Sequence, residues 1–513
     1  MEGFDGILTL LTFFPLVGVI AILLLKPLGR EEDDLIKKMA IGTSAVTFII
    51  SLWVLFRYSA GEAGLQLVDR AVWIAPLNIH YYLAVDGLSI LMILLTTFIS
   101  MLAISGSWTA IEEQVKQYYI FMLLLEAGML GVFLAQDLFL FYIFWEFTLV
   151  PMYFLIGIWG GERRVYASIK FFLYTMAGSL LMLLAILYMG LTNETFSLPE
   201  LIAGRTAFAG VQNWLFLGFA IAFAIKVPLF PFHSWLPDAH TEAPTAGSII
   251  LAGILLKMGT YGFMRFNLPL FPEAAATFAP TIAVLAIIGI IYGAIVSFAQ
   301  RDVKRLVAYS SVSHLGFVML GIFSLTEAGL QGAILQGVNH GLSTGALFYL
   351  VGVLYEKRHT REMAEFGGIW RVMPVFSALT LIVTLSSMGL PGLNGFVGEF
   401  TILLGSMGGT EALGPNAWIY TAFATSGVIL AAVYLLWMYQ RVFMGPLDNP
   451  KNEALADVNA GQLAIILSFL LFIVWIGVYP GPYFGLMDST VAELVEFVQT
   501  AIASAPSGLV VLP

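Results

Sequence analysis

The chain has 513 residues, of which 59% are hydrophobic and only 11% are charged. Soluble domains carry about 25% charged residues, so a soluble fold could not hide this much apolar surface from water. The net charge of −10 excludes a nucleic-acid-binding protein, which needs a basic surface over the phosphates. The absence of cysteine excludes disulfides, cysteine-ligated iron–sulfur clusters and thiolate catalysis. This composition is typical of a polytopic membrane protein.

Long apolar runs predict membrane-spanning helices, because the strands of a β-barrel would alternate between apolar and polar residues. We therefore expect an all-α polytopic membrane protein with about fourteen transmembrane helices. The first span lacks the basic residues of a signal peptide, and we expect it to be a retained helix. The approximate spans are 4–25, 35–57, 84–107, 117–135, 137–159, 167–190, 211–231, 245–265, 277–299, 306–323, 329–355, 373–405, 416–440 and 462–480.

The distribution of Lys and Arg predicts the orientation of the chain. Seventeen of the 23 basic residues lie in the odd-numbered connections, between spans 1 and 2, 3 and 4, and so on. The odd connections are therefore expected to face the cytoplasm, in a membrane that we expect to be a bacterial plasma membrane. Both termini would then lie on the other side. The even-numbered connections hold four basic residues, Arg57, Arg70, Arg205 and Arg265.

Two segments outside the spans have a recognisable pattern. The longest outer loop, about 58–83, ends in aromatic residues that suit a membrane interface, among them Trp73 and Tyr81. Near the C-terminus, apolar residues recur at helical spacing opposite acidic ones, which predicts a short interfacial helix. These apolar residues are Val491, Leu494, Val498 and Ile502.

Seven ionisable residues stand out in the interior of predicted spans. A charge at mid-bilayer costs about 2.5–3.5 kcal/mol on insertion scales, so each one predicts a function. Desolvation favours the neutral form of a lysine or a glutamate and an opposite charge nearby reverses this, which allows paired groups to pass protons. His residues titrate near neutrality and suit the same task. The candidate relay residues are Glu126, Glu146, Lys226, Lys257 and Glu399, with His314 and His340.

Two of the spans contain helix breakers. Pro228 and Pro231 follow Lys226 closely, and Pro391 and Gly392, with Gly395, precede Glu399. Proline removes a backbone donor, and irregular backbone at membrane depth survives only when it is buried in protein or lines a wet cavity. Paired interruptions in the two halves of a chain predict a transporter with internal repeats.

Other interpretations of these residues remain open. Glu126 could be a structural group that forms a hydrogen bond between helices, and Glu146 and Lys226 could be a purely structural ion pair. His314 and His340 could be satisfied core residues or, with less support, the two axial ligands of a haem.

The stretch from His233 to Glu242 contains ligand types but follows no recognised zinc spacing. We therefore predict no metal site, and we expect Trp235 to pack near the helix break. Asp238 and His240 are the other potential ligands in this stretch.

Four long strings closely resemble the antiporter-like membrane subunits of respiratory complex I, NADH:quinone oxidoreductase. The resemblance covers about residues 80–445, and a glutamate at position 399 resembles the M-type branch, since L-type and N-type subunits usually have lysine there. The strings are FYIFWEFTLVPMYFLIGIWGG, KVPLFPFHSWLPDAHTEAPTAGSIILAGILLKMG, RLVAYSSVSHLGF and GLPGLNGFVGEF.

The resemblance implies two inverted five-helix repeats, spans 4–8 and 9–13, with spans 7 and 12 discontinuous. It divides the chain into three N-terminal helices (1–116), a first half (117–265), a second half (266–440), and span 14 with a C-terminal interfacial segment (441–513). It makes Glu146 and Lys226 the pair of the first half and Lys257 the central relay residue. His314 and His340 continue the relay to Glu399, with Glu126 and Trp235 in support.

The function implied by the resemblance is proton translocation coupled to electron transfer from NADH to quinone. The chain itself would hold no cofactor, while FMN, iron–sulfur clusters and quinone would lie in partner subunits. The implied partners are L-like and N-like antiporter-like subunits, small membrane subunits, a peripheral redox arm and lipids. The alternatives are a subunit of an Mrp-type cation/proton antiporter, a subunit of a ferredoxin-dependent photosynthetic relative, and a non-conducting spacer.

Overall fold

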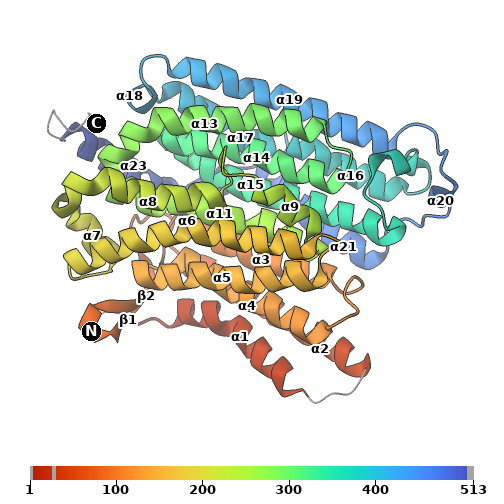
Figure 1. Cartoon of the computed structure of the whole chain (residues 1–513), viewed down its shortest axis with the longest axis horizontal. Coiled ribbons are helices and arrows are strands. Elements are labelled where there is room, and N and C mark those ends of the chain that lie inside the picture. Colours follow the sequence, from red (N-terminus) through yellow and green to blue (C-terminus); the bar gives the residue numbers. More distant parts are fainter. Residues whose placement is uncertain (1–3, 26–29, 505–513) are drawn as a thin grey trace.

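The computed structural model describes residues 4–25 and 30–504 as a bundle of long helices that run roughly side by side (Figure 1). In this part of the chain, eleven helices are long and apolar enough to cross a membrane. Helices satisfy their own backbone hydrogen bonds, which a lipid environment requires. The expectation of an all-α membrane protein is therefore confirmed, whereas the count of fourteen crossings stays a prediction.

The helices follow the predicted spans closely. The first three spans correspond to α1 (Ile7–Leu24), α2 (Arg30–Arg57) and α3 (Ile90–Gly106). Four more precede the first break: α4 (Val115–Leu134), α5 (Leu138–Trp159), α6 (Arg164–Thr192) and α8 (Gln212–Lys226), with the short α7 (Leu198–Ala203) between α6 and α8. The later ones are α13 (Pro272–Phe298), α14 (Val303–Phe323), α15 (Glu327–Arg358), α19 (Ala417–Phe443) and α21 (Ala460–Val478).

Both predicted helix breaks are present. The seventh span ends as α8 at Lys226 and resumes as α9 (Trp235–Glu242). The twelfth span consists of α16 (Pro374–Ser387) and α17 (Asn394–Gly408). Between these two helices Gly389 and Gly392 have φ angles of 77° and 91°, which favour glycine because it has no Cβ. Gly395 lies inside α17 rather than in the break.

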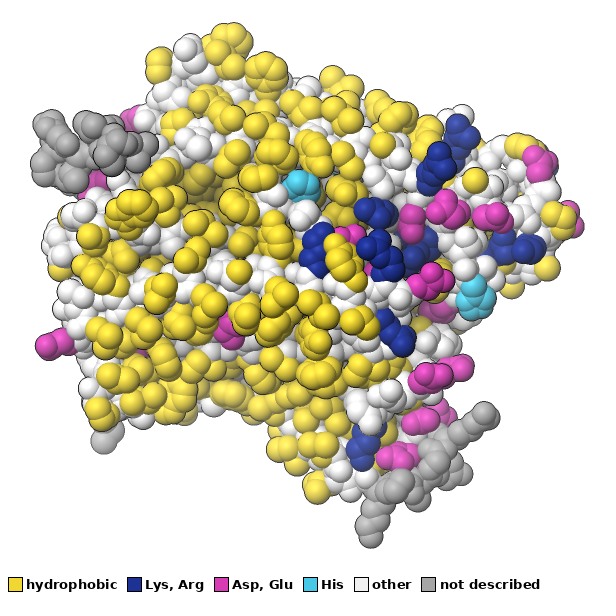
Figure 2. All heavy atoms as spheres, in the orientation of Figure 1, with side chains coloured by type: hydrophobic (Ala, Val, Ile, Leu, Met, Phe, Trp, Pro, Cys, Tyr) yellow, Lys and Arg dark blue, Asp and Glu magenta, His cyan; other side chains and the backbone are white. Residues whose placement is uncertain are grey.

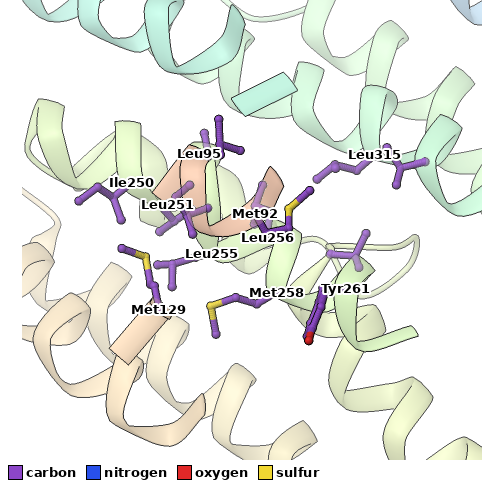
Figure 3. Close-up of a cluster of buried hydrophobic side chains, with 14 of the residues drawn as sticks. Met92, Leu95, Met129, Ile250, Leu251, Leu255, Leu256, Met258, Tyr261 and Leu315 are labelled. Atoms are coloured by element: carbon purple, nitrogen blue, oxygen red, sulfur yellow. The ribbon is translucent and has the colours of Figure 1, made fainter. Parts of the chain in front are cut away.

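The eighth span is a helix of mixed register. It consists of α10 (Thr245–Ile250), a π-helical turn (Leu251–Leu255), α11 (Leu256–Gly262), a second π-helical turn (Phe263–Asn267) and α12 (Leu268–Leu270). Figure 3 shows apolar side chains packed around its middle, with Met129 of α4 beside Leu255 and Met258. Turns of π-helix within α-helices are frequent at functional sites.

The connection 58–85 is a β-hairpin, which the sequence analysis did not predict. Strands β1 (Gln66–Ile74) and β2 (Ile79–Val85) pair antiparallel, with Ala71 opposite Tyr81. Asp69 of β1 is buried and accepts hydrogen bonds from the backbone N–H and the hydroxyl of Thr9, at 2.8 and 2.7 Å. The hairpin therefore covers the beginning of α1.

The predicted C-terminal helix is α23 (Asp488–Ala503), and it buries Val491, Val495 and Val498. It lies at the same end of the bundle as the hairpin (Figure 1). Further short α-helices in the described residues are α18 (Thr410–Leu413), α20 (Pro450–Glu453) and α22 (Gly481–Gly485).

Basic residues gather at one end of the helices, which we call the basic end. On the face in Figure 2, Lys and Arg side chains cluster there and apolar side chains cover the band beside them. The connections after α5, α13 and α15 lie at this end and carry Arg163, Arg301 and Arg361. The hairpin, α7 and α23 lie at the opposite end. Which end faces the cytoplasm stays a prediction.

Some residues counted as markers of loops or helix ends are buried instead, Arg265 and Lys304 among them. Arg265 lies inside the eighth span, which extends to Leu270, and Lys304 lies in the first turn of α14. Arg265 binds Asp86, and the Lys304 Nζ donates to the Ala243 carbonyl at 2.5 Å. Counting charges along the sequence could not separate such buried cations from solvated ones.

The same two local features, a capping Asp and an isolated β-bridge, precede each of the two helix breaks. Asp137 caps the first turn of α5 and forms an isolated β-bridge with Ser197, and Asp302 caps α14 and forms one with Glu362. The first pair lies two spans before the broken α8–α9 segment, and the second lies two spans before α16–α17. An internal repeat would produce this recurrence, although the division into two halves stays a prediction.

Candidate functional site

Four of the predicted relay residues form a continuous row of contacts that runs from the eighth span into the second half of the chain. The Lys257 Nζ lies 2.6 Å from His340 Nδ1, and the His340 and His314 rings are 6.0 Å apart. His314 Nδ1 lies 2.9 Å from Glu399 Oε1. All four residues are buried. Groups that bind protons therefore lie side by side from α11 through α15 and α14 to α17.

Close backbone approach brings Lys257 and His340 together. A Cβ on Gly341 of α15 would lie 2.9 Å from the Gly253 carbonyl oxygen, so only glycine allows this distance. Gly253 lies in the first π-helical turn, where the Leu256 N–H bonds to the Leu251 carbonyl. The carbonyl of Ala252 accepts a hydrogen bond from the Lys257 ammonium. The π-helical turn thus provides an acceptor for the lysine within its own helix.

Glu399 is held at the second helix break. Its Oε1 accepts a hydrogen bond from Gln336 Nε2 at 3.0 Å in addition to its contact with His314. Its Oε2 has no hydrogen-bond partner in the structure. Around the break, the Asn339 amide donates to the Asn394 carbonyl at 2.7 Å. One carboxylate oxygen of Glu399 is therefore available to another donor.

Both nitrogens of His314 have protein partners, Glu399 at Nδ1 and Tyr434 Oη at 3.1 Å from Nε2. An axial haem ligand needs one nitrogen directed at the iron, so this arrangement does not fit bis-imidazole ligation by His314 and His340. His340 Nε2 has no hydrogen-bond partner. The interpretation of both histidines as fully satisfied core residues therefore fails for His340.

Glu146 and Lys226 lie in the first half and interact without a hydrogen bond between them. The two side chains interact electrostatically over a distance longer than a hydrogen bond. The Lys226 Nζ has no hydrogen-bond partner in the structure. It lies 5.2 Å from the centroid of the Trp145 ring and 5.8 Å from that of Phe171. Aromatic faces attract an ammonium group without removing its protons. The arrangement therefore differs from a contact ion pair with a purely structural role.

Trp235 packs at the first break, as expected. Its indole N–H donates to the Ile225 carbonyl at 2.9 Å, next to Lys226. On the neighbouring helix, a Cβ on Gly259 would lie 2.8 Å from the Phe223 carbonyl oxygen. The end of α8 and the middle of α11, which carry Lys226 and Lys257, therefore lie in backbone contact.

Glu126 is fully buried on α4, and neither of its carboxylate oxygens has a hydrogen-bond partner in the structure. The described residues show no direct hydrogen bond from Glu126 to another helix. None of their hydrogen bonds or ion pairs joins it to the row from Lys257 to Glu399, so its supporting role stays a prediction.

The structure adds His240 and Lys304 to the site. His240 of α9 is fully buried and stacks on Phe348 with ring centroids 4.6 Å apart, and neither of its nitrogens has a partner. The His240 ring interacts electrostatically with both Lys257 and Lys304. A cavity of about 110 Å³ at the basic end is lined by Lys304 together with Glu242 and Arg361. In the sequence, His240 stands out by its position after the break, where its residue type indicates a potential metal ligand and not a relay group.

The four potential metal ligands after the first break do not converge. Asp238 binds Lys170 at 2.7 Å, and the His233 ring lies 5.6 Å from that of Phe230. Glu242 accepts a hydrogen bond from the Arg163 N–H at 2.9 Å. Within residues 4–25 and 30–504, no group of three or more His, Cys, Asp or Glu side chains is arranged to hold a metal ion.

Fold and site together define an integral membrane protein whose interior carries a row of ionisable groups between two broken helices. Residues 135–429 match the family model described as NADH:quinone oxidoreductase/Mrp antiporter, TM. The chain belongs to this family. Subunit M of NADH-quinone oxidoreductase from Rhodobacter capsulatus is 43% identical to it in an alignment of 505 residues, which covers 96% of this chain and 97% of that subunit.

Solved structures give the same result. A chain of respiratory complex I from Thermus thermophilus with bound NADH has a TM-score of 0.85 and 32% identity, covering 96% of this chain and 99% of that chain. A chain of the Mrp complex from Dietzia sp. has a TM-score of 0.83 at 18% identity, with the same coverage. The second similarity shows that the fold is shared, and the first agrees with the family assignment.

Proposed function

We propose that this chain is a proton-translocating membrane subunit of an NADH:quinone oxidoreductase. The observation that carries the proposal is the buried row from Lys257 through His340 and His314 to Glu399. The proposal is supported by the 43% identity to a protein named subunit M of NADH-quinone oxidoreductase. The oxidoreductase would need no electron carrier here, with FMN, iron–sulfur clusters and quinone in the partner subunits.

In this mechanism protons enter at the basic end, through the cavity beside Lys304 and past His240. Lys226 exchanges its proton with Lys257, because α8 and α11 lie in backbone contact. Lys257 passes a proton to His340, from which it moves through His314 to Glu399. Steps longer than one hydrogen bond, such as that from Lys226 to Lys257, would use bridging water.

The free energy needed to move a proton across the membrane is similar to the free energy of one hydrogen bond to a charged group. Moving one charge against 100 mV requires about 2.3 kcal/mol. A hydrogen bond to a charged group contributes about 1.5–3 kcal/mol. Making or breaking one contact, such as that between Lys257 and His340, would therefore shift the proton distribution by enough to work against the membrane potential.

We further propose that the basic end faces the cytoplasm of a bacterium and that both termini lie on the outer side, as the distribution of Lys and Arg predicts. L-like and N-like subunits, small membrane subunits, a peripheral redox arm and lipids would be the partners. The support for these partners is membership of the family, since respiratory complex I contains a chain with the same fold.

The test of the function is coupled proton pumping in the assembled complex. Glu146→Gln or Lys226→Ala should leave the complex assembled and lower NADH-driven proton uptake into proteoliposomes. Matched controls are Glu453→Gln and Lys451→Ala, since both residues lie exposed in α20. Normal pumping by a fully assembled Glu146 or Lys226 variant would contradict the roles assigned to these residues.

A second candidate function is a subunit of an Mrp-type cation/proton antiporter. It is supported by the family description, which covers both kinds of protein, and by the shared fold of the Dietzia Mrp chain. Purification in mild detergent separates the two candidates. Flavin and iron–sulfur proteins that purify with the chain support the oxidoreductase, whereas their absence together with Na⁺-driven proton exchange supports the antiporter.

A further inference from the structure

A second buried group of charges lies outside the relay row, at the end opposite the basic end. The Arg265 guanidinium binds the Asp86 carboxylate through two hydrogen bonds, of 2.7 and 2.5 Å. Arg265 is 7% exposed and Asp86 is 3% exposed. Both residues line a pocket of about 310 Å³, whose walls include residues of the short α7 and of α23. The ion pair therefore forms a buried part of the wall of this pocket.

This ion pair lies on the axial path from Lys257 to the pocket. Lys257, Tyr261 and Arg265 follow one another at four-residue steps, so they share roughly one face of the eighth span. At no more than 1.5 Å per residue, the rise of an α-helix, Arg265 lies at most about 12 Å along the helix axis from Lys257. A proton that moved along this face would pass Tyr261 and then Arg265.

The hydrogen bonds along this face cannot relay a proton. The Tyr261 hydroxyl donates its one proton to the Phe133 carbonyl at 2.9 Å and accepts the Arg265 Nε–H at 2.9 Å. An arginine in a protein stays protonated, so it cannot accept a further proton. A proton relay needs groups that accept a proton and then release it, and neither Tyr261 nor Arg265 meets this condition here.

Asp86 is fixed and has little capacity left to accept a proton. Its Oδ1 accepts the backbone N–H groups of Leu88 and Ser89 at 3.1 and 3.2 Å, before the first turn of α3. The guanidinium of Arg265 occupies both oxygens as well. The ion pair is thus held between the start of α3 and the eighth span. Water in the pocket would find these hydrogen-bonding groups already paired.

We propose that Asp86, Arg265 and Tyr261 form a seal that insulates Lys257 from water at the end opposite the basic end. With this seal closed, a proton on Lys257 leaves sideways to His340 instead of leaking along its own helix. The inference rests on the proposed function, because a seal is needed only if Lys257 carries protons.

The test is the passive proton leak of the whole complex in liposomes that contain a pH-sensitive dye. A K⁺ diffusion potential set with valinomycin drives the protons, and NADH and quinone are left out. The double variant Asp86→Asn/Arg265→Gln removes both charges, so no buried charge is left alone. We expect its leak to be several-fold faster than that of the wild type.

Two comparisons make this test specific. The control Asp5→Asn/Arg57→Gln removes a partly exposed ion pair of 2.7 Å at the same end, and its leak should equal that of the wild type. Adding Lys257→Met to the seal variant should suppress the leak, because the path then lacks its next proton carrier. A general loosening of the bundle would leave the leak unchanged by this addition.

An equal leak in the wild type and in the assembled double variant would overturn the seal. If the double variant does not assemble, Arg265→Lys serves instead, since it keeps the charge but loses the two-pronged contact. Its leak should exceed that of the control, and an unchanged leak would again overturn the proposal. Failure of the proposed function is distinguishable, because it would appear in NADH-driven pumping of Lys226 variants and not in this passive measurement.

Discussion

Replacing His340 by asparagine removes the proton carrier that links Lys257 to His314 and Glu399. The imidazole Nδ1 lies 2.6 Å from the Lys257 Nζ. The asparagine Oδ1 has nearly the same place on its side chain, so it can accept a hydrogen bond there but cannot take up a proton and pass it on. Lys257 would keep the Ala252 carbonyl as an acceptor. The proton would then have no group next to Lys257 to receive it in the direction of His314.

The size of the effect follows from the titrating group that is lost. Asparagine can keep the hydrogen bond to Lys257, which is worth about 1.5–3 kcal/mol when one partner is charged, but its amide does not gain or lose a proton. The step from Lys257 towards His314 therefore has no proton carrier, although the free energy of the contact is largely kept. We expect His340→Asn to lower coupled pumping strongly while the complex still assembles.

The assay is NADH-driven acidification of proteoliposomes, measured together with the rate of NADH oxidation in the same preparation. His359→Asn is the matched control, because His359 follows the same helix, α15, but lies exposed at the basic end. Its left-handed φ of 52° is a conformation that asparagine tolerates well. If the assembled His340→Asn complex moves as many protons per NADH as the control, the relay through His340 is refuted.

Three further substitutions test other parts of the site. Glu399→Gln removes the charge that His314 and Gln336 contact, so pumping should fall. Pumping should persist in the control Glu411→Gln, since Glu411 lies exposed in α18, and equal pumping by the two variants would contradict the relay role of Glu399. Trp235→Phe leaves the buried Ile225 carbonyl without its donor and should lower the unfolding free energy by about 1–3 kcal/mol in thermal unfolding, unlike Trp214→Phe at an exposed position. Gly341→Ala places a Cβ 2.9 Å from the Gly253 carbonyl oxygen and should cost about 1–3 kcal/mol and reduce pumping, whereas Gly408→Ala has nothing within 4 Å and should do neither.

The helices and their breaks could be predicted because they depend on local sequence. Apolar runs of membrane-spanning length define the helices, and Pro228 and Pro391 interrupt two of them. The β-hairpin could not be predicted in this way. Its pairing brings Asp69 to Thr9, sixty residues away, and no local pattern records such a contact.

The sequence predicts which residues form the row from Lys257 to Glu399 but not how they contact one another. Lys257 and His340 could be identified because each stands out in an apolar run. Their contact depends on Gly253 and Gly341 and on a π-helical turn, which are tertiary features.

Arg265 and Lys304 were misplaced for a related reason. Each follows or precedes an apolar run by a few residues, so charge counting treated both as markers of loops or helix ends. In the structure each is buried against a partner from another segment, Asp86 for Arg265 and the Ala243 carbonyl for Lys304. A cation near the end of a span is therefore a weaker sign of orientation than one in the middle of a loop.

The central claim is that this chain carries protons through its two buried lysines. The most direct measurement is the number of protons moved per NADH oxidised by the reconstituted complex with both Lys226→Met and Lys257→Met. Because both lysines are buried and neither variant changes a surface contact, the complex should still assemble. The account predicts a lower ratio than in the wild type. An unchanged ratio in the fully assembled double variant would contradict it and would favour a spacer that conducts no protons.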